Sequence, residues 1–155
     1  VIPVQELLDA AGKYFKKLMK NRPERIELEI ESMEAKVIGD VNQLRFLLEN
    51  LIDEALTVRE DGVIRLQARK DNEYIRFLFT DTRREKSVEE LNQLFYPNLA
   101  RMTSGEKGEL RGTEYLVCKQ IIRDHDEFAG RRGCRINAEP AEGGGFTVYF
   151  TIPRR

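Results

Sequence analysis

The chain has 155 residues, a length typical of one domain with a sizeable hydrophobic core. Its composition is that of an ordinary globular protein, and its formal net charge of -1 gives no general attraction to nucleic acid. No apolar run reaches the ~20 residues that a membrane helix requires, and no secretory signal opens the chain. We expect one cytoplasmic domain, residues 1–155, without a nucleic-acid partner or membrane insertion of its own. Because the chain starts at Val1 rather than Met, we expect it to be a piece of a longer protein.

The chain contains two cysteines and one histidine, which is little material for metal or catalytic clusters. Cys118 and Cys134 lack the spacing of metal ligands, and we expect both to be reduced, with Cys118 on the buried face of a helix. With His125 as the only histidine, a His-based metal site or a Ser-His-Asp triad is disfavoured. A reducing compartment fits this cysteine usage.

The first part of the chain predicts a helix and two short strands. Residues 5–20 place apolar side chains at helical spacing, and their lysines form a basic stripe that is either a solvated face or a contact for an anionic partner. Residues 25–31 alternate apolar and charged side chains, as a half-buried strand does. We expect residues 35–40 to be the antiparallel neighbour of that strand.

The middle of the chain predicts a long helix and a hairpin. Asp40 is the expected N-cap of a helix over residues 41–58, and Gln43 completes a capping box. Residues 63–69 and 74–81 are apolar runs on either side of a KDNE turn, which predicts two antiparallel strands.

The last part predicts a second capping box over residues 87–90, at the start of a short helix. Residues 96–111 carry two glycines, a proline and mixed charge, which is typical of a long mobile loop. A helix over 112–124 and a hairpin of 135–139 with 146–153 complete the domain. Helices on one face of a mostly antiparallel mixed sheet predict an α+β fold, a two-layer α/β sandwich.

Several short motifs occur in an order and spacing that resemble one known family. They are GD-x-x-QL at 39–44, NLI at 50–52, FTDT at 79–82, LFYP at 94–97, CKQIIRDH at 118–125 and EGGGFTVYFTIP at 142–153. Together they resemble the catalytic ATP-binding domain of sensor histidine kinases, which has the Bergerat fold shared with gyrase and the heat-shock chaperone ATPases. The resemblance spans nearly the whole chain and implies a nucleotide pocket.

The resemblance assigns the nucleotide-facing positions of the predicted helix 41–58 and of the strand 74–81. Asn50 matches the first helix asparagine of the family, and Glu54 stands where a second asparagine would hold Mg²⁺. A carboxylate can also ligate Mg²⁺, so Asn50 and Glu54 are metal ligands if the metal binds. Asp81 matches the aspartate that accepts the adenine amino group, although it could instead be a capping residue at a strand end. The family's phosphate-binding lysine falls on Thr57, and Arg59 or Arg83 could partly replace it.

The glycine positions of the resemblance are mostly altered. Arg83 and Glu85 stand where two glycines follow the adenine-binding aspartate, and bulky side chains there remove backbone freedom and close approach. Ahead of the closing helix only Gly112 is kept, and Glu114 puts a carboxylate where the resemblance places an anionic phosphate.

These departures predict a degenerate nucleotide pocket, without ATP or Mg²⁺ as cofactor, in a regulatory or docking module of two-component signalling. The expected partners are other signalling domains or proteins, such as a dimerisation and phosphoacceptor domain or a response regulator. The alternative is an active catalytic domain that binds ATP and Mg²⁺ and passes phosphate to a histidine on a separate domain. A protein serine kinase of the anti-sigma-factor type is a third hypothesis, which no residue specifically favours. His125 matches the histidine of the family's His-Gly-Gly turn rather than a phosphoacceptor, and we expect it near the end of its helix.

Overall fold

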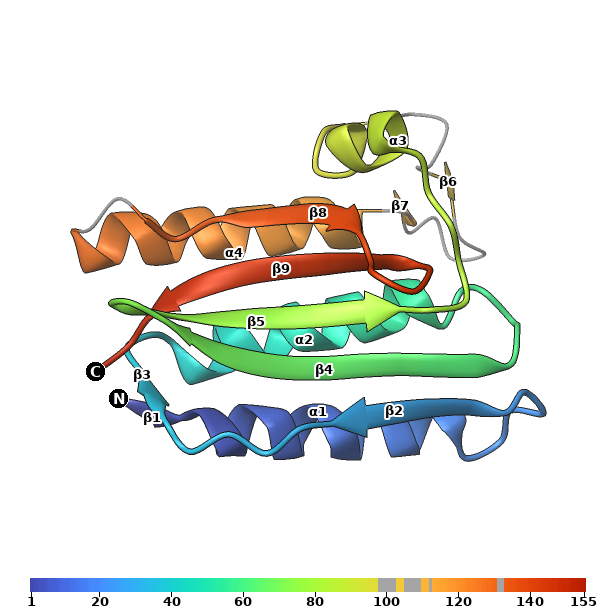
Figure 1. The fold of residues 1–155 in the computed structure, drawn as a ribbon, viewed down its shortest axis with the longest axis horizontal. Coiled ribbons are helices and arrows are strands. Elements are labelled where there is room, and N and C mark those ends of the chain that lie inside the picture. The colour runs from blue at the N-terminus through green and yellow to red at the C-terminus, as the bar shows by residue number, and fades with distance from the viewer. Residues whose placement is uncertain (98–102, 105–109, 112, 131–132) are drawn as a thin grey trace.

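A computed structural model describes residues 1–97, 103–104, 110–111, 113–130 and 133–155 (Figure 1). Most of the predicted loop 96–111, and Gly112, lie outside these residues. The part of the loop that is described contains two short strands, β6 (Thr103–Ser104) and β7 (Leu110–Arg111), which pair antiparallel.

A five-stranded sheet with the order β2-β4-β5-β9-β8 forms one layer of the molecule (Figure 1). The strands are β2 (Ile26–Ile30), β4 (Gly62–Asp71), β5 (Tyr74–Asp81), β8 (Ile136–Pro140) and β9 (Phe146–Pro153). β2 pairs parallel with β4, and the other neighbours are antiparallel. The sheet is therefore mixed and mostly antiparallel, and both predicted hairpins are confirmed.

Three helices form the second layer and cover one face of the sheet (Figure 1). They are α1 (Val4–Met19), α2 (Val41–Ala55) and α4 (Glu114–Ala129), and the short α3 (Val88–Gln93) lies next to β8 at one edge of the sheet. The alternating inward residues of the strands meet the apolar faces of the helices in one core, in which the rings of Phe77 and Phe150 stack at 4.8 Å. The predicted α+β two-layer sandwich is confirmed, and no helix in the described ranges is long and apolar enough to cross a bilayer.

The predicted pairing of residues 35–40 with strand 25–31 is wrong. β3 (Lys36–Val37) pairs antiparallel with β1 (Ile2–Pro3), and β2 pairs with β4 instead. Adjacency in sequence suggested a hairpin, but the 31–35 segment carries the chain away from β2 to the N-terminal end of α1, where Val4 donates a backbone hydrogen bond to Ala35.

The capping box of α2 and the end of α4 differ from the sequence prediction. The Asp40 side chain caps α2 by accepting the Gln43 backbone N–H at 3.0 Å, as predicted. The Asp40 backbone N–H, which a capping box would give to the Gln43 side chain, donates instead to Nε2 of His125 at 3.0 Å. His125 thus ties α4 to the start of α2, and α4 continues beyond it until Gly130 ends the helix with φ +61°.

Candidate functional site

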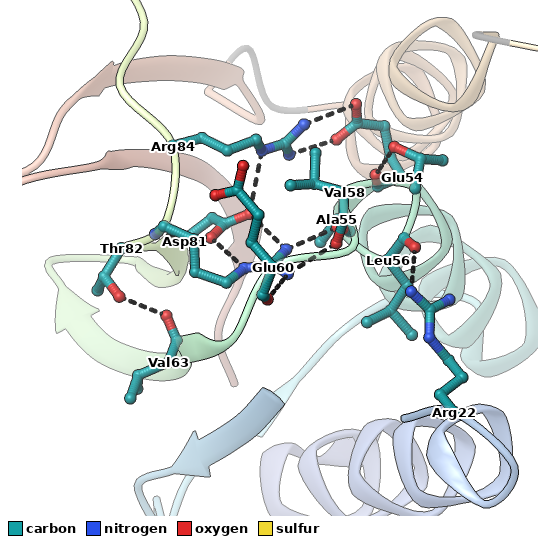
Figure 2. A network of polar contacts seen from close by, with 12 residues as sticks. Arg22, Glu54, Ala55, Leu56, Val58, Glu60, Val63, Asp81, Thr82 and Arg84 are labelled. Carbon is teal, nitrogen blue, oxygen red and sulfur yellow. Dashed lines mark hydrogen bonds and ion pairs between the residues drawn. The ribbon is translucent and has the colours of Figure 1, made fainter. Parts of the chain in front are cut away.

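The candidate site lies where the end of β5 meets the C-terminal half of α2 and the first turn of α4 (Figure 2). Asp81 is the last residue of β5 and is 1% exposed. Its position at a strand end agrees with the sequence expectation. A carboxylate this deeply buried requires hydrogen-bonded or charged partners, because an unpaired buried charge is costly.

Arg83 is the main partner of Asp81, and its side chain is also 1% exposed. Asp81 Oδ1 accepts hydrogen bonds from the Arg83 backbone N–H at 3.0 Å and from Arg83 Nε at 2.9 Å, and Oδ2 accepts from Nη2 at 3.0 Å. The remaining donors reach the end of α2 and the segment after it: Nη1 donates to the Val58 and Glu60 carbonyls at 2.9 Å, and Nη2 to the Ala55 carbonyl at 2.6 Å. All five guanidinium N–H groups of Arg83 therefore have partners within the protein.

Two glycines make room for this arrangement. Gly62 begins β4 with φ +146°, and a Cβ there would lie 2.5 Å from Cγ of Arg83. Gly145 precedes β9 with φ +83°, and a Cβ there would lie 2.1 Å from the Asp81 carbonyl oxygen. Glycine is needed at both places because the backbone has left-handed φ values and because neighbouring atoms approach closely. The strand ends are thus shaped around Asp81 and Arg83.

Arg84 connects Asp81 to α2 (Figure 2). Its Nε donates to Asp81 Oδ2 at 3.1 Å, while Nη1 and Nη2 donate to the two carboxylate oxygens of Glu54 at 3.3 and 2.8 Å. The guanidinium carbon lies 5.2 Å from the ring centroid of Phe146. Burial opposes the charge of Arg84, but the hydrogen bond and the negative charge of Glu54 outweigh burial, so the pKa of Arg84 lies above its usual value.

Tyr115 completes the network from α4. Its hydroxyl donates to Glu54 Oε2 at 2.6 Å, and its ring meets Phe95 edge to face at 5.6 Å between centroids. Burial, and then the charge of Glu54, raise the pKa of Tyr115 well above its ordinary value, so the hydroxyl stays protonated and can donate. Glu54 is therefore held by Arg84 on one side and by Tyr115 on the other.

Asn50 lies one turn before Glu54 on α2 and is 7% exposed. Its side-chain nitrogen donates to the Phe46 carbonyl at 2.8 Å, a bond within the same helix. The two predicted metal-ligand positions thus share one side of α2, but Glu54 is already bound to Arg84 and Tyr115. Across the described ranges, no group of three or more His, Cys, Asp or Glu residues is arranged to hold a metal ion.

The other predicted site residues have separate surroundings. Glu85 accepts the Gly145 backbone N–H at 3.0 Å and so fixes the turn before β9. Glu114 is the first residue of α4, where its charge favours the helix dipole. Gly112 lies outside the described residues.

Sequence reasoning missed Arg84 and Tyr115. Arg84 lies three residues after Asp81 and stands among several charged side chains, so the sequence offers no sign that it would turn towards Glu54. Tyr115 lies in the helix predicted over residues 112–124, and helical periodicity does not indicate a polar partner. A partly buried carboxylate at position 54 favours a charged partner, and that preference is the signal that could have prompted a search for one.

Comparison with solved structures shows the same fold in histidine kinase catalytic domains. A mycobacterial sensor histidine kinase, MprB, matches with a TM-score of 0.75 and 18% identity over 99% of this chain and 96% of that chain. The nucleotide-free catalytic domain of the histidine kinase ThkA matches with 0.74 and 21% over 99% and 93%. ThkA in complex with the response regulator protein TrrA matches with 0.72 and 19% over 99% and 41%.

Comparison with curated protein sequences found no match. The model of one protein family does match, over residues 39–155, and its description is histidine kinase-, DNA gyrase B-, and HSP90-like ATPase. This match covers the helix, strands and closing hairpin that build the site, and well over half of the chain. The chain belongs to this family of ATPase domains.

Proposed function

We propose that this domain is a degenerate histidine kinase-like ATPase domain that no longer turns over ATP and acts as a regulatory or docking module in two-component signalling. The observation that carries the proposal is the set of hydrogen bonds that the Asp81 carboxylate accepts. In the family resemblance this carboxylate accepts the adenine amino group, and here it is bound by two arginines of its own chain.

Asp81 has no spare acceptor position in this arrangement. A carboxylate offers about four lone-pair positions. Asp81 accepts four hydrogen bonds, three from Arg83 and one from Arg84. An adenine amino group would have to displace one of these charged donors, and a neutral amine is the weaker partner of a carboxylate. The pocket as built does not fit adenine recognition through Asp81.

Glu54 also argues against a metal and triphosphate. A bare carboxylate about 4 Å from a phosphate charge costs on the order of 4 kcal/mol at an effective dielectric of 20. Arg84 neutralises the charge of Glu54, and its guanidinium group is paired with two carboxylates, those of Glu54 and Asp81. For Arg84 to serve a phosphate, or for Glu54 to ligate Mg²⁺, this bridge would have to break. No cofactor is therefore part of the proposed function.

Isothermal titration calorimetry of the 155-residue chain with ATP and ADP, with and without Mg²⁺, tests the proposal. We expect no saturable binding up to millimolar nucleotide. A double variant, Arg83→Gly with Arg84→Gly, frees Asp81 and Glu54, and we expect it to gain weak nucleotide binding if the arginines exclude the ligand. Micromolar binding of Mg–ATP by the wild-type chain would overturn the proposal.

Such binding would support the alternative, an active domain with ATP and Mg²⁺ as cofactors. The discriminating assay is then incubation of the longer parent protein with labelled ATP. Label on a histidine of a separate domain, absent from Asn50→Ala, would establish phosphoryl transfer. Under the proposed function the parent stays unlabelled. Its candidate partners are a dimerisation and phosphoacceptor domain or a response regulator, the latter by analogy with the ThkA complex.

A further inference from the structure

The outer edge of β2 has no strand partner in the part of the chain that the structure describes. β2 lies at one end of the sheet order, and β4 is its only strand neighbour within the described ranges. Arg25 accepts the Gly62 N–H and Glu31 donates to the Leu66 carbonyl, so the odd-numbered residues turn their backbone groups towards β4. Because backbone groups alternate in direction along a strand, Ile26, Leu28 and Ile30 turn theirs outwards. An open row of donors and acceptors of this kind can pair with another strand.

A groove of about 740 Å³ runs beside this edge, between β2 and α1. Gly12 of α1 lets the helix come close, since a Cβ there would lie 3.1 Å from Cδ1 of Ile30. Leu28 and Ile30 are half-buried and line the groove together with the rim of Phe15. A strand added at the edge would place every second side chain over this partly apolar groove.

The opposite face of β2 is acidic. Glu27, Glu29 and Glu31 are exposed and point away from the helices. On the inner neighbour β4, Arg65 pairs with Glu29 at 3.2 Å and Arg69 with Glu31 at 3.0 Å. Glu27 has no ion pair among the described residues and lines the groove edge. β4, which pairs with the inner edge of β2, has apolar side chains on the helix side and the basic Arg65 and Arg69 on the other side. A strand on the outer edge of β2 would be favoured by the same pattern.

A second copy of this chain does not satisfy that chemistry. If two β2 strands paired antiparallel about Leu28, Glu27 of each copy would stand opposite Glu29 of the other. Like charges directly opposite each other are destabilising on a sheet. The glutamates thus disfavour self-association at this edge and favour a partner strand with lysine or arginine.

We propose that the outer edge of β2 and the adjoining groove bind an extended segment of a partner protein as a sixth strand, and that this segment alternates apolar with basic residues. The backbone groups of β2 supply the pairing, the groove takes the apolar side chains, and the glutamates select the basic ones. The inference rests on the docking role proposed above but not on the state of the nucleotide site.

Fluorescence anisotropy of labelled seven-residue peptides with the 155-residue chain tests this inference. One series alternates valine or isoleucine with lysine or arginine, and a matched series replaces the basic residues with glutamate. We expect the basic series to bind about tenfold more tightly than the acidic series, with the difference shrinking at high salt. N-methylation of the peptide nitrogens that face β2 should abolish binding, and N-methylation of the alternate nitrogens should not.

A protein variant and its matched control locate the surface. Glu27→Lys should weaken binding of the basic peptides several-fold and strengthen binding of the acidic ones. Glu139→Lys makes the same charge change on β8, the strand at the other end of the sheet, where residue 139 is also exposed. It should leave both affinities unchanged.

Three results would overturn the inference. The first is no saturable binding by any basic peptide. The second is equal loss of affinity on N-methylation at either set of nitrogens, which indicates side-chain docking without strand addition. The third is a concentration-dependent dimer that Leu28→Pro disrupts, which indicates a second copy at this edge. None of these results bears on the nucleotide titrations, so failure here is distinguishable from failure of the proposed loss of ATP turnover.

Discussion

At the scale of single residues, Asp81 is a buried carboxylate that accepts hydrogen bonds from two arginines of its own chain. Asp81 stays at the end of a strand beside α2, where the family resemblance places it. The side chain two residues later then supplies five donors that satisfy the carboxylate and three backbone carbonyls at once. Under the proposed function, the carboxylate that the resemblance assigns to adenine instead anchors an ion pair within the chain.

We predict that Arg83→Met destabilises the domain by about 3–5 kcal/mol, because it removes two of the four hydrogen bonds to the buried Asp81 carboxylate and the side-chain donor of three carbonyls. Urea unfolding followed by circular dichroism measures this change. The control is Arg59→Met, whose side chain is 64% exposed in its pair with Glu24 and whose loss should cost about 1 kcal/mol or less. Equal effects of the two substitutions would show that the Arg83 network is not structural.

The two cysteines should be slow to react with alkylating reagents. Burial, and then the nearby charge of Asp126, raise the pKa of Cys134 from 9.0 to about 11, and burial raises that of Cys118 further. Because the thiolate is the reactive form, we expect iodoacetamide to label Cys134 more slowly than a free thiol at pH 8, with a rate that rises up to about pH 11. Cys118 should be labelled only after unfolding. Rapid labelling of both residues at pH 7 would contradict these expectations.

At the scale of elements, a side-chain cap marks the start of α2 and of α3, whereas α1 and α4 start without a side-chain cap hydrogen bond. At α3, the Ser87 side chain accepts the Glu90 N–H and the Glu90 carboxylate accepts the Ser87 N–H, both at 3.1 Å. We predict that Ser87→Ala removes about 1 kcal/mol from the local stability of α3. Amide hydrogen exchange of residues 88–93 should accelerate accordingly. Ser87→Asp keeps an acceptor and should leave the exchange rates nearly unchanged.

The elements themselves were mostly predictable from the sequence. Alternation in residues 25–31 identified a strand correctly, because one face of β2 is more buried than the other. The apolar run at 74–81 also identified a strand, and β9, which lies between two strands, is buried along nearly its whole length. The pairing of β3 was not predictable in this way. Its partner β1 has only two residues, and that pairing depends on where α1 packs, which no local pattern records.

The sequence positions of the candidate site residues could be assigned from the resemblance, but the hydrogen bonds between them could not be predicted. The resemblance located Asn50, Glu54 and Asp81, and the structure puts the last two in one network through Arg84. That link depends on side-chain direction after the end of a strand, where neither helical nor strand periodicity applies. Likewise the role of Gly62 in accommodating Arg83 follows from a backbone φ of +146°, which the sequence does not reveal.

At the scale of the whole molecule, the helices cover one face of the sheet (Figure 1), and ion pairs lie on the other face. Arg65 with Glu29, Arg69 with Glu31, and Arg76 with Asp71 link neighbouring strands or the two arms of a hairpin on the exposed side. Exposed pairs of this kind contribute little individually. Their shared dependence on ionised carboxylates, however, makes the stability of the domain sensitive to acid.

We predict that the free energy of unfolding falls as the pH drops below about 4.5. Hydrogen bonds from Arg69 and Gln67 lower the pKa of Glu31 from 4.5, and a backbone hydrogen bond with help from Arg59 lowers that of Glu24. A carboxyl with a lower pKa in the folded state stabilises the fold above its unfolded pKa and loses that contribution as the pH falls through the folded value. Urea unfolding from pH 7 to pH 3 measures the slope. Glu31→Gln should flatten it, whereas Glu34→Gln, an exposed residue without an ion pair in the described ranges, should not. Identical slopes for wild type and Glu31→Gln would show that the pairing across β2 and β4 carries none of the acid sensitivity.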